Sequence, residues 1–278
     1  MMRWAGFAGD VASYPVYGYE STTREQKLTL GTKAGDNRHQ TSVHLTVLKR
    51  GVPIDHTDWH RAADDEQVNG RPTFWFYTFV GEFNFPWRKL DWDYVDGNWA
   101  RMELFQNDVL PPAKSARAIA ETVRFGRPER VKLPMRFTEP LPGMVTERVS
   151  IDPFDAAKRD VSVGLSLRGA DHDGVARVDV HVSTPDPNGQ LPRPHHTTGY
   201  TTVDGHPAVR WFSGPNGDFG PVDKPEADTE RLTVFGVGGM TVSVAVQGVP
   251  TLRNRFAPHG AAGVFGRLTV VDDPAHWF

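Results

Sequence analysis

Apolar and polar residues alternate along much of the chain, and the alternation occurs in two similar series. It covers 26–30 and 42–48 in the first series, and 161–167 and 176–182 in the second. A period of two places successive side chains on opposite faces of a strand, so we predict strands there. Further strands are predicted from aromatic or alternating runs at 74–77, 87–93, 98–105, 232–235 and 240–246.

The two series are related by a shift of 135 positions. The turn sequence Val68-Asn69-Gly70-Arg71-Pro72 returns as Val203-Asp204-Gly205-His206-Pro207, and the same shift places Leu28 on Val163. Matching apolar positions over a long stretch without a gap indicate an internal repeat. We interpret the chain as a duplication with two domains, 1–132 and 133–278.

A single convincing helix is predicted at 115–125. Ile119 and Val123 share one face with small alanines, and Ser115 is placed to cap its start. The matching segment of the second series, 251–265, contains Pro258 and two glycines, so we expect its helix to be short, displaced or missing. The expected fold class is therefore α+β: two tandem repeats, each an antiparallel β-sheet backed by a single helix, with the second helix degenerate.

The order of these elements resembles the extracytoplasmic domain of Gram-positive anti-sigma factors and of related membrane-anchored envelope proteins of unknown function. The resemblance covers about residues 40 to 145, and its motifs are Val68–Pro72, Leu90–Trp92, Asp96–Trp99, Ile119–Val123 and Leu133–Phe137. These motifs are features of a fold, so no catalytic residue is carried over. The resemblance implies a sensory or ligand-binding domain outside the cytoplasm, anchored to a membrane by a segment upstream of this chain. A cytoplasmic location is the alternative.

Composition narrows the classes of function. The 278 residues carry a net charge of −3 and the sequence contains no cysteine. A weakly negative chain offers no strong field for nucleic acid, so we expect no nucleic-acid partner. The lack of cysteine excludes disulfides, thiolate metal sites and cysteine nucleophiles. No cofactor is predicted.

The strongest candidate for chemistry is a histidine pair in the polar segment 49–66. His56 and His60 lie four positions apart, near Asp55 and Asp58, which is the spacing of two metal ligands on a helix. A metalloprotease helix carries glutamate directly after its first histidine, but this chain has threonine there. We favour a polar surface loop and predict no metal, while a metal-dependent hydrolase that uses His56, His60 and nearby acids stays as an alternative.

Other motifs are explained by turns and strands. Asp171-His172-Asp173 and Gly236–Gly239 have the composition of hairpin turns. His195 and His196 are adjacent in an extended segment, where their side chains point in opposite directions. Ser213 lacks the glycine two residues before it that a nucleophile elbow requires.

Aromatic residues crowd into one part of the first repeat, and those that face outward would form a contact surface. The candidate residues for binding a ligand or partner are Trp75, Tyr77, Trp87, Trp92 and Trp99. Packing in the core and between repeats is the alternative explanation. We therefore expect a non-enzymatic cell-envelope domain that binds a small apolar ligand or a protein partner, with a purely structural assembly protein as a further alternative.

Overall fold

The structure is a computed structural model of the chain. It describes residues 16–31, 42–48, 51–52, 54, 60–61, 67–80, 85–95, 98–105, 113–124, 132–155, 160–169, 176–185, 199–213, 219–220 and 228–278. The chain divides into two compact units, Met1–Val131 and Lys132–Phe278.

The first unit contains one antiparallel sheet. Its strands are β1 (Val16–Thr22), β2 (Glu25–Gly31), β3 (Ser42–Leu48), β4 (His60–Arg61), β5 (Thr73–Val80), β6 (Phe85–Val95) and β7 (Asn98–Phe105). They lie in the order β1-β2-β3-β7-β6-β5-β4. The last strand of this series, β7, therefore lies in the middle of the sheet, between β3 and β6.

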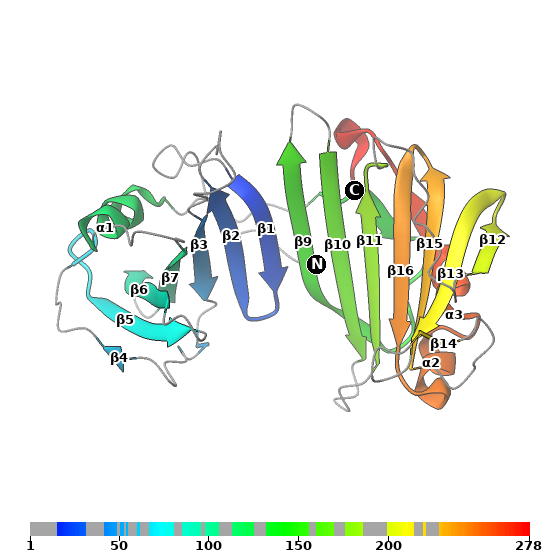
Figure 1. Ribbon diagram of the computed structural model, residues 1–278, viewed down its shortest axis with the longest axis horizontal. Coiled ribbons are helices and arrows are strands. Elements are labelled where there is room, and N and C mark those ends of the chain that lie inside the picture. The colour runs from blue at the N-terminus through cyan, green and yellow to red at the C-terminus, as the bar shows by residue number, and fades with distance from the viewer. Residues whose placement is uncertain are drawn as a thin grey trace. The chain divides into compact units, whose positions relative to one another are not determined.

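The second unit contains a main antiparallel sheet, which is seen in Figure 1, and a separate two-stranded sheet. Its strands are β8 (Met135–Phe137), β9 (Met144–Asp155), β10 (Asp160–Gly169), β11 (Arg177–Ser183), β12 (Gly199–Val203), β13 (His206–Ser213), β14 (Phe219–Gly220), β15 (Thr229–Val237), β16 (Met240–Gln247) and β17 (Leu268–Val270). The main sheet has the order β9-β10-β11-β16-β15-β13-β12, with β14 paired to β13, and β8 pairs with β17 separately.

The two main sheets have the same strand order and matching registers. Leu28 lies opposite Leu45 in the first sheet, and Val163 lies opposite Val180 in the second, 135 positions later. After β5 and β13 the equivalent residues of the two units are 142 positions apart. This larger shift is seen in the pair Leu90–Met102, which corresponds to the pair Leu232–Val244. Seven additional residues therefore lie between β13 and β15, and the strand pairing beyond them is unchanged.

Each sheet has one apolar face. In the first unit Leu28, Leu45, Leu90 and Met102 are buried across neighbouring strands, and in the second unit four residues of β16 are buried at alternate positions: Met240, Val242, Val244 and Val246. Alternation places these side chains together on one face, where burial removes apolar surface from water. The predicted alternation at 42–48 and 240–246 thus corresponds to the core.

The predicted α+β fold class is wrong, because the described structure is mostly antiparallel sheet. Its helices are α1 (Ala113–Thr122), α2 (Pro250–Phe256) and α3 (Gly260–Phe265), which has contacts with β15 and β16. A helix rises only about 1.5 Å per residue, so helices this short cannot back sheets of this width. None of the helices in the described part of the chain is long and apolar enough to cross a membrane.

The observed ends of the helices differ from those predicted from the sequence in two ways. α1 begins at Ala113, so Ser115 lies within the helix and is not its cap. In the second unit Pro258 disfavours helical geometry at the residue before it, and Ala257 has φ −135° and ψ 67°. The expected degenerate helix is therefore two short helices on either side of this break.

We predict that Gly260→Ala destabilises the second unit by more than about 2 kcal/mol. Gly260 has φ +61°, and a β-carbon there would meet the Glu230 carboxylate, which is buried and bound by Arg210 at 2.9 Å and 2.7 Å. Urea unfolding measures the loss. Gly205→Ala is the matched control, since Gly205 has φ +81° with open space around it, and it should cost only about 1 kcal/mol. Equal losses for the two variants would contradict the steric explanation.

Candidate functional site

The repeated turn sequence forms the same tight turn in both units. In the first unit the amides and carbonyls of Val68 and Arg71 bond to each other at 3.1 Å and 3.0 Å, with Asn69 at φ 51° and Gly70 at φ 74°. In the second unit Asp204 and Gly205 have φ 49° and 81°. Two successive positive φ values favour asparagine, aspartate and glycine, which explains the motif by backbone geometry.

A hollow of about 360 Å³ lies beside this turn in the first unit. Three segments line it: the turn itself, the end of β6, and the residues that follow α1. The lining side chains are Val68, Asn69 and Arg71 from the turn, Trp92, Asp93 and Tyr94 from β6, and Val123 and Arg124 from the helix end. The hollow therefore combines an apolar floor with hydrogen-bonding groups of both charges.

Three hydrogen bonds meet at the end of α1, and one of them comes from the turn. Arg124 donates from its Nη1 to the carbonyl of Glu121 at 2.6 Å and to that of Val123 at 3.1 Å. Asn69 donates from its Nδ2 to the same Glu121 carbonyl at 3.5 Å. The last carbonyls of a helix lack partners within the helix, and a guanidinium there also complements the helix dipole. Arg124 is thereby held at the wall of the hollow.

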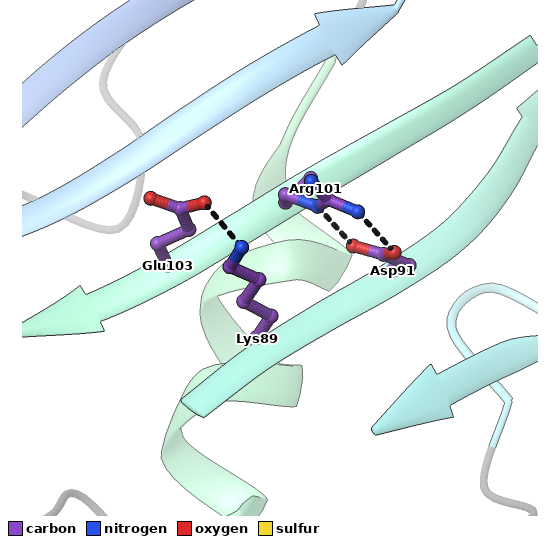
Figure 2. A network of polar contacts seen from close by, with 4 residues as sticks. All are labelled: Lys89, Asp91, Arg101 and Glu103. Carbon is purple, nitrogen blue, oxygen red and sulfur yellow. Dashed lines mark hydrogen bonds and ion pairs between the residues drawn. The ribbon is translucent and has the colours of Figure 1, made fainter. Parts of the chain in front are cut away.

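Two ion pairs lie along β6 and β7, on the sheet face opposite the apolar core (Figure 2). Arg101 binds both carboxylate oxygens of Asp91, from Nε at 2.9 Å and from Nη2 at 3.0 Å. Lys89 lies 3.4 Å from Glu103. The Asp91 side chain is only 1% exposed, and that of Arg101 is 13% exposed, so the pair is almost completely removed from water.

Burial shifts the pKa values of these groups. Desolvation lowers the pKa of Lys89 even though Glu103 lies beside it. Desolvation would also lower the pKa of Arg101, but its hydrogen bonds to Asp91 and the charge of Asp91 outweigh this and raise it. His44, which lies opposite Glu103 on β3, has its pKa lowered to about 4 by burial and by Lys27, against the opposing effect of Glu103.

The same positions of the second unit carry uncharged residues and one arginine that has no ion pair among the described residues. With the shift of 142 positions, Asp91 and Arg101 correspond to Thr233 and Ser243, whose hydroxyls are 3.0 Å apart. Lys89 and Glu103 correspond to Arg231 and Ala245. The sheet therefore forms without the buried ion pairs, and the charges of the first unit are not a requirement of this topology.

A smaller hollow, of about 250 Å³, borders the corresponding turn of the second unit. Its lining includes Tyr200, Gly205, Pro207 and Phe235, with no charged side chain. Tyr200 is 56% exposed. Among the described residues, charged side chains thus line the first of these two hollows and not the second.

The predicted aromatic residues have different environments. Trp75 and Trp92 are buried, at 5% and 2% exposure, and Trp92 also lines the hollow. Trp99 is partly exposed, with its ring 5.5 Å from that of Phe74. Tyr77 lies opposite Arg88 and Trp87 opposite Thr78 in the sheet, while their side chains lie outside the described part. Their role in binding a ligand or partner stays a prediction.

Most of the other candidates lie outside the described residues. This holds for His56, for Asp171–Asp173 and for His195 and His196, while His60 is paired opposite Tyr77 in the short strand β4. Gly238 and Gly239 form the predicted hairpin turn between β15 and β16, both with positive φ. Among the described residues, no group of three or more histidine or acidic side chains could hold a metal ion.

Sequence reasoning missed Arg71, Asp93, Tyr94 and Arg124 as site residues. Arg71 belongs to the repeated turn, whose sequence indicates only a turn, and Arg124 is outside the apolar stripe of the helix predicted at 115–125 and follows the observed α1. Only the meeting of the turn, β6 and the helix end brings them to one hollow. Comparison of the chain with protein-family models and with curated proteins finds no match.

We predict that Arg101→Ser costs about 3–5 kcal/mol, because it leaves the Asp91 carboxylate buried without its bidentate partner. The double variant Asp91→Thr with Arg101→Ser, which installs the residues of the second unit, should cost less than this single variant. Urea unfolding of both measures the difference. Arg117→Ser is a control, because the Arg117–Glu121 pair is partly exposed to solvent and should contribute less than about 0.5 kcal/mol. A double variant that is less stable than Arg101→Ser would contradict the prediction.

We predict that His44 makes folding stability fall as the pH decreases from 6.5 to about 4. In this range the unfolded chain binds a proton on His44 while the folded chain keeps it neutral, so protonation favours unfolding. The contribution is on the order of 1–2 kcal/mol, allowing for the partial exposure of the ring. The unfolding free energy of the wild type minus that of His44→Gln, measured across this range, should decrease by this amount as the pH falls. Parallel curves would rule out this role for His44.

Proposed function

We propose that this chain is a non-enzymatic ligand-binding protein whose first unit recognises a small molecule in the hollow beside the Val68–Arg71 turn. The observation that carries this proposal is the difference between equivalent positions of the two units. Asp93 and Tyr94 stand in the first unit where Phe235 and Gly236 stand in the second. Among the described residues, the same fold therefore gathers charged recognition groups at the first hollow and not at the second.

The side chains of this hollow are suited to recognition. A guanidinium stays charged at neutral pH and donates hydrogen bonds without releasing a proton. Burial raises the pKa of Tyr94, so its phenol also stays protonated and can donate. Trp92 supplies an aromatic surface, and a volume of about 360 Å³ is at the lower end of the range for small-molecule sites. These properties support binding of a compact ligand.

The buried ion pairs support the same assignment. They fix the face of β6 that carries Asp91 and Asp93, and the end of this strand lines the hollow. The equivalent positions of the second unit lack these ion pairs. We therefore infer that they hold β6 in the position that the ligand requires, and buried ion pairs can have such a role in specificity. A sensory role in the cell envelope follows from the resemblance to anti-sigma factor ectodomains alone and stays a prediction.

Fragment screening by two-dimensional NMR tests the proposal. We expect fragments with affinities near 1 mM to shift the indole signal of Trp92 and the side-chain amide signal of Asn69. Tyr200→Ala, which alters the hollow of the second unit, is the matched control and should leave these shifts unchanged. Fragments that shift only the signals of the second hollow, or a full fragment library without any shift at Trp92, would overturn the proposal.

A further inference from the structure

The guanidinium of Arg124 is only partly used by the protein. Its Nη1 donates to two carbonyls at the end of α1, whereas within the described residues Nε and Nη2 make no hydrogen bond. The side chain is exposed and lines the hollow. An arginine held by one nitrogen keeps its remaining N–H groups in a fixed plane, which lowers the entropy lost when they bind a ligand.

The Nε and Nη2 edge of a guanidinium matches the two oxygens of a carboxylate. Two parallel N–H···O bonds form between them, and charge-assisted bonds of this kind are stronger than neutral ones. Arg71 adds a second positive charge to the lining, against the single negative charge of Asp93. The described side chains that line the hollow therefore carry a net positive charge, which favours an anion.

The rest of the hollow fits an apolar body of limited size. Val68, Trp92 and Val123 are all buried, and together they provide an aliphatic and aromatic floor. Tyr94 can donate one further hydrogen bond as a neutral phenol. A ligand with a carboxylate at one end and a compact apolar group at the other satisfies both parts of the lining.

We propose that the hollow binds a small carboxylic acid in its ionised form, with Arg124 as the bidentate anchor and Trp92 under the apolar body. This inference rests on the proposed function, because it names the class of ligand for the same site. The inference attributes the specificity for a carboxylate to Arg124. It can therefore be tested separately from the existence of the binding site.

Benzoate and its neutral isostere benzamide are the probes. Titrations of the full chain, followed by the NMR signals of the Trp92 indole and the Arg124 Nε–H group, give both affinities. We expect benzoate to bind at least tenfold more tightly than benzamide, which is the order of magnitude of a charge-assisted hydrogen-bond pair. We expect Arg124→Gln to lower the benzoate affinity at least tenfold.

Two further variants distinguish the binding of the carboxylate by Arg124 from an effect of net charge and from an effect on folding. Arg117→Gln also removes one positive charge, from α1 and outside the hollow, and should change the benzoate affinity less than twofold. Arg124→Lys keeps the charge but not the planar fork, so it should bind benzoate more weakly than the wild type and more tightly than Arg124→Gln. This variant also provides the test if the glutamine variant is poorly folded.

The outcomes distinguish the two proposals. Equal binding of benzoate and benzamide at Trp92 would overturn the carboxylate inference and leave the binding site in place. Equal losses for Arg117→Gln and Arg124→Gln would also overturn it, because the effect would then be general electrostatics. If neither probe shifts the Trp92 signal while other fragments do, the ligand class is wrong, and if no fragment does, the proposed function is wrong as well.

Discussion

The pairing of β6 with β7 is the constraint on which the rest of the first unit depends. Its register places Leu90 opposite Met102 on the apolar face and Asp91 opposite Arg101 on the other. Because the side chains of a strand alternate, a slip by one residue would move Asp91 into the core and Leu90 out of it. The bidentate ion pair and the apolar pair therefore specify the same register from the two faces of the sheet.

This register also determines the end of β6, where the candidate site lies. Trp92 is on the apolar face of the sheet, while Asp93 is on the face of the ion pairs, and both line the hollow. The helix end reaches the same place because Asn69 and Arg124 bind its last carbonyl groups. One strand, one turn and one helix end thus share few but specific contacts, which is the arrangement expected of a preorganised site.

The second unit shows what the topology requires by itself. It has the same strand order and the same pairing between its central strands, yet it uses hydroxyl groups where the first unit uses a buried ion pair. Its own buried carboxylate, Glu230, is bound by Arg210 at the position where Gly260 approaches. Charges are buried in both units, but at different places, so each unit has its own polar network on a common framework.

The local sequence pattern was sufficient to predict many strands and turns. Alternation located β3 and β16, the Asn-Gly and Asp-Gly sequences located the turns, and the shift of 135 positions anticipated the shared register of β2–β3 and β10–β11. It was insufficient for the fold class. A helix of ten residues looks the same in sequence whether it covers a sheet or only its edge, and the extent of a sheet depends on pairing between distant strands.

The candidate site also divides into features that the local sequence predicts and features that depend on the tertiary structure. By itself the sequence determined strands, turns and the concentration of aromatic residues, because these follow from the conformational and burial preferences of neighbouring residues. Only the tertiary structure decided that Trp92 is buried, that Asp91 meets Arg101, and that Arg124 lies beside the turn at residues 68–71. Such contacts join residues far apart in the chain, and their geometry is set by sheet register and helix placement, which no local pattern contains.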